Sequence, residues 1–485
     1  MENIHWIAHG VFLADLIIRL GLTVRVILRR LPVGTSLAWL LIILVFPLVG
    51  AFIYLVMGES RLGLRRARRA AAYRERRGQG VSEQRPSGGF DVAHLGPGGA
   101  ALARLAGATL GAVVLPGNRL ELQQDAAAAF PALIADIDRA RLTCHLEFYI
   151  WSPGGLADEV GTALKRAVQR GVQCRVLVDA IGSKAFLKST LAGELRQAGV
   201  AIVAALPTGL LWLLFRRVDL RMHRKIVVID DVVGYTGSLN LADPRLFKQD
   251  AGVGQWVDAL VRVQGPAVDA LADTFREDWA LEAGETIDPV RPATDAPAET
   301  TGGPAAVQVL PTGPAERVEA IEQVVLQGLY AATREVVLTT PYFVPSEALL
   351  LALLSAAARG VAVTLIVPAK VDSRMAHLAS RSFQADLLEA GVRVALFQGG
   401  LLHTKSITVD EQFSLFGSLN LDPRSLRLDF EITLGVYDAA FTAGLRRLQQ
   451  HYLDGSALLA LAECRARSRL ERFAEDTARL VGPLL

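Results

Sequence analysis

The longest apolar run without a charged residue lies near the start of the chain. The stretch Trp39–Met57, WLLIILVFPLVGAFIYLVM, contains no charged side chain and approaches the roughly 20 residues that a helix needs to cross a bilayer. Trp39 and Tyr54 lie near its ends, where amphipathic aromatic rings favour the membrane interface. The pattern therefore predicts a transmembrane helix at Trp39–Met57.

A second apolar stretch precedes it, from about Trp6 to Leu28. It also contains four polar or charged side chains, namely His9, Asp15, Arg19 and Arg25. Because each of these is costly at the centre of a bilayer, the stretch either spans the membrane or lies in its interface. We expect one or two transmembrane helices within residues 1–60.

A basic block follows the clean span, with Arg61, Arg65, Arg66, Arg68, Arg69, Arg74, Arg76 and Arg77. Positive charges beside a transmembrane segment mark its cytoplasmic side, so we expect the rest of the chain in the cytoplasm. The block either attracts anionic head groups or forms a solvated helical connector. Together with Gly78–Gly99, which is rich in Gly, Ser and Pro, it makes residues 61–100 a basic segment and linker.

Two long blocks of alternating strand and helix patterns make up the remainder. One contains LEFYIW at Leu146–Trp151 and the other VVLTTPYF at Val336–Phe343, and each continues as β-α-β-α-β with helices closed by glycine. The closing glycines correspond in pairs, Gly171 with Gly360 and Gly199 with Gly391. The pattern predicts an α/β fold of two duplicated halves packed about a pseudo-two-fold axis, at residues 101–282 and 306–485, with a linker at 283–305.

The first half carries an insertion that the second half lacks. Gly199 and His223 are 24 positions apart, whereas Gly391 and His403 are 12 apart. The extra residues include the apolar run Leu210–Phe215, which two arginines follow. This run is either a core helix or a surface that dips into the bilayer.

Six residues recur in both halves with the same internal spacing. The first half has His223, Lys225, Asp230, Gly237, Ser238 and Asn240; the second half has, always 180 positions later, His403, Lys405, Asp410, Gly417, Ser418 and Asn420. A single His-x-Lys is weak evidence of function. Six identities at fixed spacing in two copies indicate a site that both halves build.

These residue types suit a phosphodiester. The His and Lys of each copy are two residues apart and so project from the same face of a strand. Imidazole is nucleophilic near neutral pH, lysine neutralises phosphate oxygens, and Ser, Asn and backbone N–H groups hydrogen-bond the charge that develops there. One histidine can attack phosphorus while the other protonates the leaving alcohol and deprotonates the incoming one. Asp230 and Asp410 end the strands and are expected to stabilise turns.

Composition bears on the alternatives. We expect neither a metal nor another cofactor, because the repeated companion of each histidine is a lysine, which cannot ligate while protonated. With 51 basic and 49 acidic side chains and 7% aromatic residues, the chain does not favour nucleic acid as a partner. Three widely spaced cysteines predict buried apolar thiols rather than disulfides or a zinc site: Cys144, Cys174 and Cys464.

The duplicated HxKx4D…GSxN pattern resembles the mark of the phospholipase D superfamily. Over nearly the whole chain the sequence more closely resembles bacterial cardiolipin synthases, through PVGTSLAWLLIILVFPLVGAFIYLVMGE, LEFYIW, DAIGS, RMHRKIVVID, PYFVPSEALL, LLHTKSITVD, GSLNLDPRSLRLDFE and the terminal GPLL. This resemblance implies two phospholipase-D-like αβ halves with the active site at their junction. Together with the apolar segments, it predicts a multi-pass protein of the bacterial inner membrane with both halves in the cytoplasm.

The resemblance also implies a reaction, the transfer of a phosphatidyl group from one phosphatidylglycerol to another with release of glycerol. His223 would be the nucleophile and His403 the general acid and base. The family holds each imidazole with a carboxylate, and the matching positions are Asp258 and Glu431. Asp258 lies 35 residues after His223, but Glu431 lies 28 after His403, so a plain surface aspartate is the alternative for Asp258.

Other functions share this motif. A hydrolytic phospholipase D differs only in letting water enter second, and a phosphodiesterase or nuclease would need a basic groove with stacking aromatics. A membrane scaffold would not need both motif copies. Membrane anchoring favours the transferase, because a lipid acceptor is concentrated at the site. The expected partners are phosphatidylglycerol and other membrane phospholipids, and the motifs imply no particular oligomeric state.

Overall fold

The structure is a computed structural model that describes residues 2–29, 33–46, 48–58, 66, 68–69, 73, 90–207, 217, 219–290, 303–314 and 319–480. The chain divides into two compact units. Residues 1–65 and 208–220 form the N-terminal unit, and residues 66–207 and 221–485 form the sheet unit. The apolar run Leu210–Phe215 lies outside the described residues, so its two interpretations stay predictions.

Three helices make up most of the described part of the N-terminal unit: α1 (Glu2–Leu28), α2 (Val33–Val45) and α3 (Val49–Met57). They share a small apolar cluster, formed by Leu22, Val26, Trp39, Ile43, Ala51 and Tyr54. In this cluster the ring centroids of Trp39 and Tyr54 are 5.4 Å apart. Within α1, Arg19 forms an ion pair with Asp15 one turn earlier, so these two opposite charges neutralise each other.

The prediction of one continuous helix at Trp39–Met57 is wrong, because this stretch is divided between α2 and α3. In the sequence, Pro47 lies between the two helices, and proline has no backbone N–H to donate and a ring that crowds the preceding turn. Leu48, which follows it, has a left-handed φ of 56°. Within the described part of the chain, no helix combines the length and the apolar character that crossing a membrane requires.

Two arginines of the basic block contact the C-terminal end of helix α10 (Ala267–Ala283). Arg66 forms an ion pair with Glu282, and Arg69 donates a hydrogen bond to the carbonyl oxygen of Leu281 at 3.0 Å. Basic side chains are favourable at this end of a helix. These contacts favour a connector that packs on the sheet unit as the role of Arg66 and Arg69, over binding of lipid head groups.

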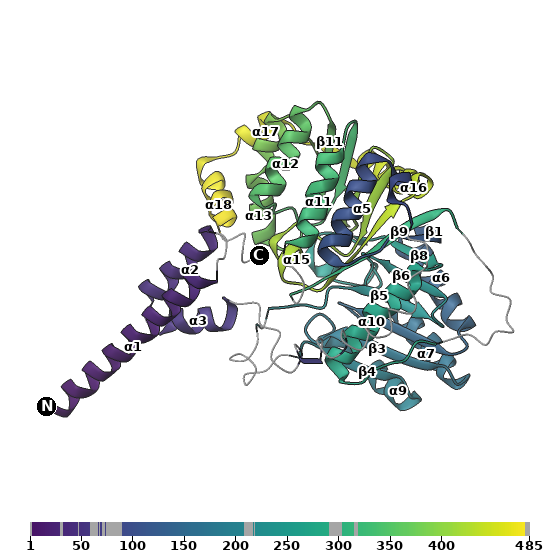
Figure 1. Ribbon diagram of the computed structural model, residues 1–485, viewed down its shortest axis with the longest axis horizontal. Coiled ribbons are helices and arrows are strands. Elements are labelled where there is room, and N and C mark those ends of the chain that lie inside the picture. The colour runs from purple at the N-terminus through teal and green to yellow at the C-terminus, as the bar shows by residue number, and fades with distance from the viewer. Residues whose placement is uncertain are drawn as a thin grey trace. The chain divides into compact units, whose positions relative to one another are not determined.

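One sheet of 15 strands forms the centre of the sheet unit (Figure 1). The strands of the first half are, in spatial order, β1 (Leu115–Gln123), β8 (Leu260–Gln264), β6 (Val233–Gly237), β5 (Lys225–Ile229), β2 (Thr143–Phe148), β3 (Gln173–Asp179) and β4 (Ala201–Ala205). Those of the second half are β9 (Ala305–Thr312), β16 (Glu431–Tyr437), β15 (Phe413–Gly417), β14 (Lys405–Val409), β10 (Glu335–Thr339), β11 (Ala362–Pro368), β12 (Arg393–Phe397) and β17 (Ser456–Leu458).

The two halves have the same strand order, apart from the additional β17, and they meet where β1 pairs with β9 in antiparallel fashion. A separate parallel pair, β7 (Trp256–Val257) with β13 (Leu401–Leu402), also joins the halves. The predicted α/β class and the duplication are confirmed. The repeated pairing also shows which residues are equivalent, since Glu147 pairs with Ile226 as Thr339 pairs with Ser406.

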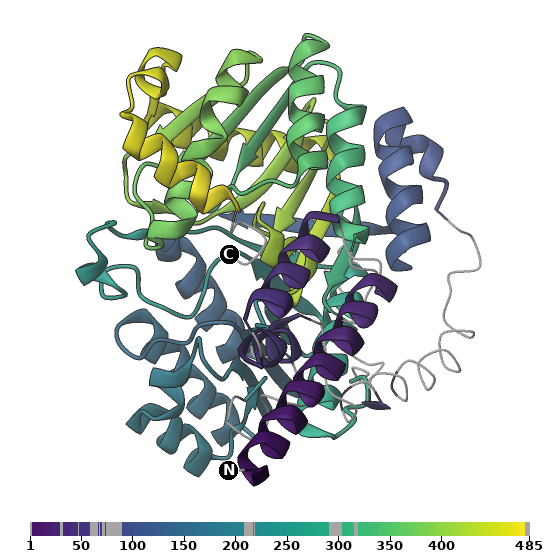
Figure 2. The same ribbon diagram turned by 90° about the vertical axis from the view of Figure 1, so that its left-hand side faces the viewer.

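Helices cover both faces of the sheet (Figure 2). In the first half one apolar core is shared by α6 (Ala126–Arg139), α7 (Leu156–Gln169), α8 (Lys184–Leu187) and α9 (Thr190–Ala198). Helix α10 is not part of this core and contacts strands β5, β6 and β9. The second half has α11 (Ala320–Ala331), α12 (Glu347–Ala358), α13 (Arg374–Ser382), α14 (Gln384–Glu389), α15 (Pro423–Arg427), α16 (Ala439–Asp454), α17 (Leu461–Arg465) and α18 (Arg469–Leu480). The three cysteines are buried and free, as predicted.

Helix α5 (Gly96–Leu110) spans the predicted boundary at residue 100 and packs on the second half. Its buried residues Leu102, Ala103 and Ala106 belong to the same apolar core as α11 and α12. The short helix η1 (Val92–Leu95) precedes it, with the carboxylate of Asp91 accepting from the N–H of Ala93. Regular structure thus begins before Gly99, where the sequence predicted a linker.

Candidate active site

Each motif histidine is held by a backbone contact with the other half of the sheet unit. The N–H of His223 donates to the carbonyl oxygen of Phe430 at 2.9 Å, and the N–H of His403 donates to that of Val257 at 2.8 Å. Phe430 and Val257 immediately precede the two predicted carboxylates. The position of each imidazole therefore depends on the half to which it does not belong.

The carboxylates pair with the histidines crosswise. His223 Nδ1 lies 2.9 Å from Glu431 Oε1, and His403 Nδ1 lies 2.7 Å from Asp258 Oδ1. All four side chains are buried. The spacings counted along the sequence compared each histidine with the carboxylate of its own half, which is the wrong partner. Asp258 is a buried partner of His403 rather than a surface aspartate.

The motif serines explain why the two spacings differ. Ser238 exchanges hydrogen bonds with the backbone of Ala259, and Ser418 does the same with Ile432. Asp258 and Glu431 each precede the residue so bonded, so they are equivalent positions. The additional residues of the first half, 35 against 28, therefore lie between Asn240 and Asp258, in a loop that contains the short helix η3 (Gln249–Ala251).

The serine hydroxyls have protein partners of their own. Ser238 Oγ donates to the carbonyl oxygen of Ala259 at 3.2 Å, and Ser418 Oγ donates to Glu431. The sequence predicted that they hydrogen-bond phosphate oxygens. In the structure they fix the strands that carry the two carboxylates.

Lys225 and Lys405 are buried side by side with their histidines. Each Nζ donates to the carbonyl oxygen of the histidine two residues earlier, at 2.6 Å in both halves. Burial lowers the pKa of Lys225 to about 8, and burial likewise holds the pKa of Lys405 well below its usual range. An anion bound between the two lysines would stabilise the charged form of both ammonium groups and raise their pKa values.

Both imidazoles are neutral in this environment. Burial, together with the charges of Lys225 and Lys405, holds the pKa of His223 well below its usual range. Burial lowers the pKa of His403 to about 3, although Asp258 acts in the opposite direction. Because Nδ1 faces the carboxylate in each pair, the network assigns the proton to Nδ1 and leaves a lone pair on Nε2.

The two carboxylates differ in their protonation. Burial raises the pKa of Glu431 to about 7, although Lys225 and the Ser418 hydroxyl oppose this. Burial would also raise the pKa of Asp258, but the contacts with His403 and Lys405 outweigh it, and the pKa is lowered. The two halves of the site are therefore similar in geometry, but the pKa values of their carboxylates are shifted in opposite directions.

The motif asparagines are buried, and both have an amide atom left unpaired among the described residues. Asn240 Oδ1 accepts from the N–H of Ile150 at 3.2 Å, while its Nδ2 has no partner. In Asn420 it is Oδ1 that lacks a partner. A buried amide without a partner is costly unless a ligand satisfies it. The Nδ2 of Asn240 is thus a buried donor that a ligand could satisfy.

The motif aspartates lie at hairpin turns. Asp230 and Asp231 between β5 and β6, and Asp410 and Glu411 between β14 and β15, all have a φ between 51° and 56°, as the two central residues of a type I′ turn require. The carboxylates of Asp230 and Asp410 each accept three backbone N–H groups ahead of the neighbouring strand. These contacts fit a role in the turns.

Aromatic rings that the sequence did not single out pack against the imidazoles. The Tyr149 ring centroid is 4.9 Å from that of His223, and the Trp256 centroid is 4.4 Å from that of His403. They are not equivalent positions, because strand pairing aligns Tyr149 with Pro341. In the sequence, Tyr149 lies in the stretch LEFYIW and Trp256 lies in the longer segment before Asp258. No sequence pattern identified either ring as a site residue.

Arg224 also escaped the sequence argument, although it directly follows His223. Its Nε donates to the carbonyl oxygen of Glu431 at 3.0 Å and its Nη2 to that of Thr312 at 2.9 Å. It also forms a buried ion pair with Asp278. Arg224 thus ties the strand that carries Glu431 to the first half.

Comparison with known proteins agrees with this arrangement. The family description "Cardiolipin synthase, PLD-like domain" matches residues 133–279 and 325–452, and "Phospholipase_D-nuclease N-terminal" matches residues 17–59. Cardiolipin synthase A of Serratia proteamaculans is 44% identical over 96% of each chain. The chain belongs to the cardiolipin synthase family of the phospholipase D superfamily. Cardiolipin synthase A of Edwardsiella ictaluri is 43% identical, again over 96% of each chain.

Membership of the cardiolipin synthase family confirms the predicted resemblance and the predicted enzyme class, a phosphatidyltransferase of the phospholipase D type. Among solved structures, phosphatidylserine synthase of Haemophilus influenzae superposes with a TM-score of 0.59 at 17% identity, over 79% of this chain and 100% of that chain. At this identity the likeness shows the fold alone.

Proposed function

We propose that this protein joins two molecules of phosphatidylglycerol into cardiolipin and releases glycerol, through a phosphatidyl-histidine intermediate. The observation that carries the proposal is the pair of crossed His–carboxylate contacts, with two buried lysines beside them. Such a site can bind one phosphodiester between two imidazoles. It also agrees with family membership.

In the first step, His223 Nε2 attacks the phosphorus of the donor lipid. The P–N bond forms as the bond to the glycerol oxygen breaks, and His403 gives that oxygen a proton. Glu431 accepts the Nδ1–H of His223 and stabilises the positive charge on its ring. Before the step, the bound phosphodiester places negative charge beside His403, which raises its pKa and lets it hold the proton that it donates.

In the second step, a hydroxyl of the acceptor phosphatidylglycerol attacks the same phosphorus. His403 takes the hydroxyl proton, the P–N bond breaks, and His223 returns to its neutral state. Lys225 and Lys405 neutralise the non-bridging oxygens in both steps, and the free Nδ2 of Asn240 donates to one of them. Ser238 and Ser418 support the carboxylates instead of the phosphate.

The N-terminal unit provides the membrane contact in this proposal. Large apolar side chains are exposed along all three helices, among them Phe12 and Ile17 on α1, Leu41 on α2 and Phe52 on α3. Such extended apolar surface is unfavourable in water and suits a lipid environment. We place this unit in the bacterial inner membrane and the sheet unit on its cytoplasmic side, where the acceptor lipid is concentrated.

The proposal predicts the products from a single labelled lipid. Vesicles that contain the protein and labelled phosphatidylglycerol should accumulate cardiolipin and glycerol, with a smaller amount of phosphatidic acid because water competes as acceptor. Chromatography of the lipids measures all three. Phosphatidic acid without cardiolipin would mean a hydrolytic phospholipase D.

The pKa of Lys225 predicts an alkaline limit to activity. The ammonium form binds phosphate, and it is present below the pKa of about 8 and lost above it. We expect kcat/KM to fall by about tenfold per pH unit well above pH 8. Lys225→Arg should extend the activity to higher pH. An unchanged alkaline limit in an active Lys225→Arg enzyme would assign it to another group.

A further inference from the structure

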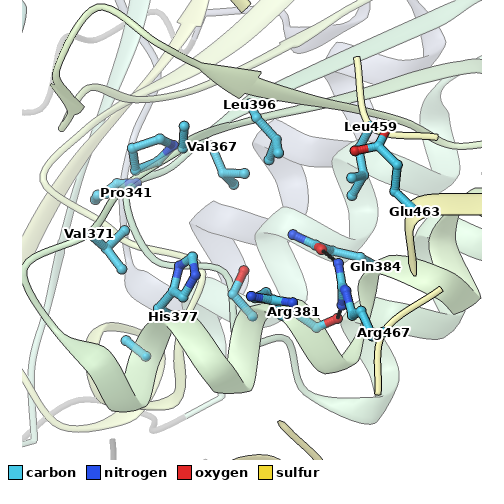
Figure 3. A pocket seen from close by; sticks show the side chains of 14 residues that line it. Pro341, Val367, Val371, His377, Arg381, Gln384, Leu396, Leu459, Glu463 and Arg467 are labelled. Atoms are coloured by element: carbon cyan, nitrogen blue, oxygen red, sulfur yellow. Dashed lines mark hydrogen bonds between the residues drawn. The ribbon is translucent and has the colours of Figure 1, made fainter. Parts of the chain in front are cut away.

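A pocket of about 280 Å³ lies in the second half, at the carboxyl ends of three parallel strands (Figure 3). Pro341 lies just beyond β10, Pro368 ends β11 and Leu396 lies in β12. Open α/β sheets bind ligands in this position. The proposed reaction, as described above, uses none of the polar residues that line the pocket.

The polar wall of the pocket is rich in donors. His377 and Arg381 come from α13, and Arg467 comes from the link between α17 and α18. Arg467 is fixed in place, because its guanidinium donates to the carbonyl oxygen of Arg381 at 3.0 Å and to Gln384. Figure 3 shows Arg381 and His377 along the same wall, between Pro341 and Arg467.

Two acidic side chains accompany the two arginines of this wall. Glu475 of α18 is buried behind it and pairs with Arg381 at 2.8 Å and with Arg467 at 3.1 Å. Glu463 lines the pocket from α17 and accepts from the N–H of Ala460. Burial and the charges of the two arginines lower the pKa of His377, against the influence of Glu475. The arginines therefore dominate the potential at His377.

One side of the pocket adjoins the surroundings of His403. Val371 lines the pocket and also packs against the apolar cluster of Val253, Trp256 and Leu401. Trp256 is the residue whose ring contacts His403. The next residue, Asp372, accepts from Tyr342 and pairs with Lys248. Burial would raise the pKa of Asp372, but these two contacts outweigh it and lower the pKa.

The corresponding positions of the first half are filled differently. Strand pairing aligns Pro341 with Tyr149 and Pro368 with Asp179. Tyr149 packs its ring on His223, and Asp179 accepts from the N–H groups of Ile181, Gly182 and Met222. A large ring and an acidic side chain thus stand where the second half has two prolines. The donor-rich wall belongs to the His403 side.

Reaction chemistry requires a second anion site. Once the donor phosphatidyl group is bound to His223, both lysines are engaged in neutralising the oxygens of its phosphate. The acceptor phosphatidylglycerol brings a phosphate of its own, separated from the attacking primary hydroxyl by the three carbons of its glycerol. His403 deprotonates that hydroxyl, so the acceptor phosphate must be held on the His403 side and away from Lys225 and Lys405.

We propose that the pocket between Pro341 and Arg467 binds the phosphodiester head group of the acceptor phosphatidylglycerol, with Arg381 as its principal donor. This inference rests on the proposed function and adds to it the place of the second substrate. Arg381 binds the phosphate, His377 and Gln384 offer further polar contacts, and Arg467 and Glu475 hold Arg381 in position. The pocket thus acts in the second step only.

The test is Arg381→Gln in vesicles where labelled phosphatidylglycerol is diluted in phosphatidylcholine. A charged contact to phosphate is worth about tenfold or more in binding. We expect about a tenfold higher surface concentration of phosphatidylglycerol for half-maximal cardiolipin formation, and a larger share of phosphatidic acid. The burst of glycerol from the first turnover should stay unchanged, because donor attack does not use the pocket.

Two variants control for structure. Arg374→Gln removes the same charge from an exposed position of the same helix outside the pocket lining, and it should behave as the unchanged enzyme. Glu475→Gln breaks the ion pair of Arg381 but keeps the arginine, so its acceptor dependence should shift less than that of Arg381→Gln. Equal shifts in Glu475→Gln and Arg381→Gln would assign the effect to packing of α13 on α18 and overturn the proposal.

A soluble competitor identifies the ligand. The deacylated head group glycerophosphoglycerol should inhibit cardiolipin formation by the unchanged enzyme and should inhibit Arg381→Gln less. Equal inhibition by inorganic phosphate would reduce the pocket to a general anion site and contradict a head-group site. If the unchanged enzyme makes no cardiolipin, the proposed function fails. If it does, and Arg381→Gln keeps the same acceptor dependence and products, only this inference fails.

Discussion

The enzyme with His223 replaced by alanine is expected to lose cardiolipin formation by about 10⁴-fold or more, which is the scale of removing a nucleophile. In the proposed mechanism His403 does not take over this role, because its Nε2 is needed to move the proton. The measurement is an acid-quenched reaction with phosphatidylglycerol that carries a labelled acyl chain. The unchanged protein should retain label, and His223→Ala should retain none.

His403→Ala provides the matched control for this prediction. Its loss should depend on the leaving group, because a general acid matters only when the leaving oxygen needs a proton. With phosphatidyl-p-nitrophenol as donor, His403→Ala should release nitrophenol in a burst and keep the phosphatidyl group on His223. A labelled His223→Ala protein, or a burst in His223→Ala but not in His403→Ala, would exchange the two roles.

The duplication made much of the fold predictable from sequence. Paired glycines and two copies of the motif, 180 residues apart, gave two αβ halves, and the sheet has the same strand order in each. The packing of α5 on the second half was not predictable, because its apolar pattern fits any apolar core and names no partner. Pairing of β1 with β9 brings that core within reach.

The N-terminal region shows the limit of an argument from hydropathy. A window of apolar residues measures how well a segment suits lipid, but not whether the segment is one helix. The apolar stretch is divided between α2 and α3, with a left-handed φ at Leu48, and in the sequence Pro47 stands at this division. The proline was visible in the sequence, and its tolerance in lipid-buried helices made one helix the simpler prediction.

The site was predictable as a set of residues but not as a set of contacts. The repeated spacing identified His223 and His403, and the family resemblance identified Asp258 and Glu431. Which carboxylate meets which imidazole depends on Val257 and Phe430, whose carbonyl oxygens bind the opposite histidines. Backbone pairing between halves has no signature in residue identity. The rings of Tyr149 and Trp256 escaped for the same reason.

Each carboxylate contacts the histidine of the other half, so its replacement should impair that histidine. If each carboxylate served the histidine of its own half, the effects of the two variants would be exchanged. Glu431→Gln should impair His223, and Asp258→Asn should impair His403, each by about 10³-fold to 10⁴-fold in cardiolipin formation, as loss of the carboxylate that orients an imidazole does elsewhere. With phosphatidyl-p-nitrophenol the two variants should separate. Asp258→Asn should keep the burst and the labelled protein, and Glu431→Gln should lose both.

Asp136→Asn is the control for changing a buried carboxylate, because Asp136 contacts Tyr235 and Arg262 and no imidazole; its burst should be retained. Double variants complete the argument, since residues that act as one unit are not additive. Adding Glu431→Gln to His223→Ala should cost little more, whereas adding Glu431→Gln to His403→Ala should remove the remaining burst. A burst lost in Asp258→Asn but kept in Glu431→Gln would mean that each carboxylate serves the histidine of its own half during catalysis.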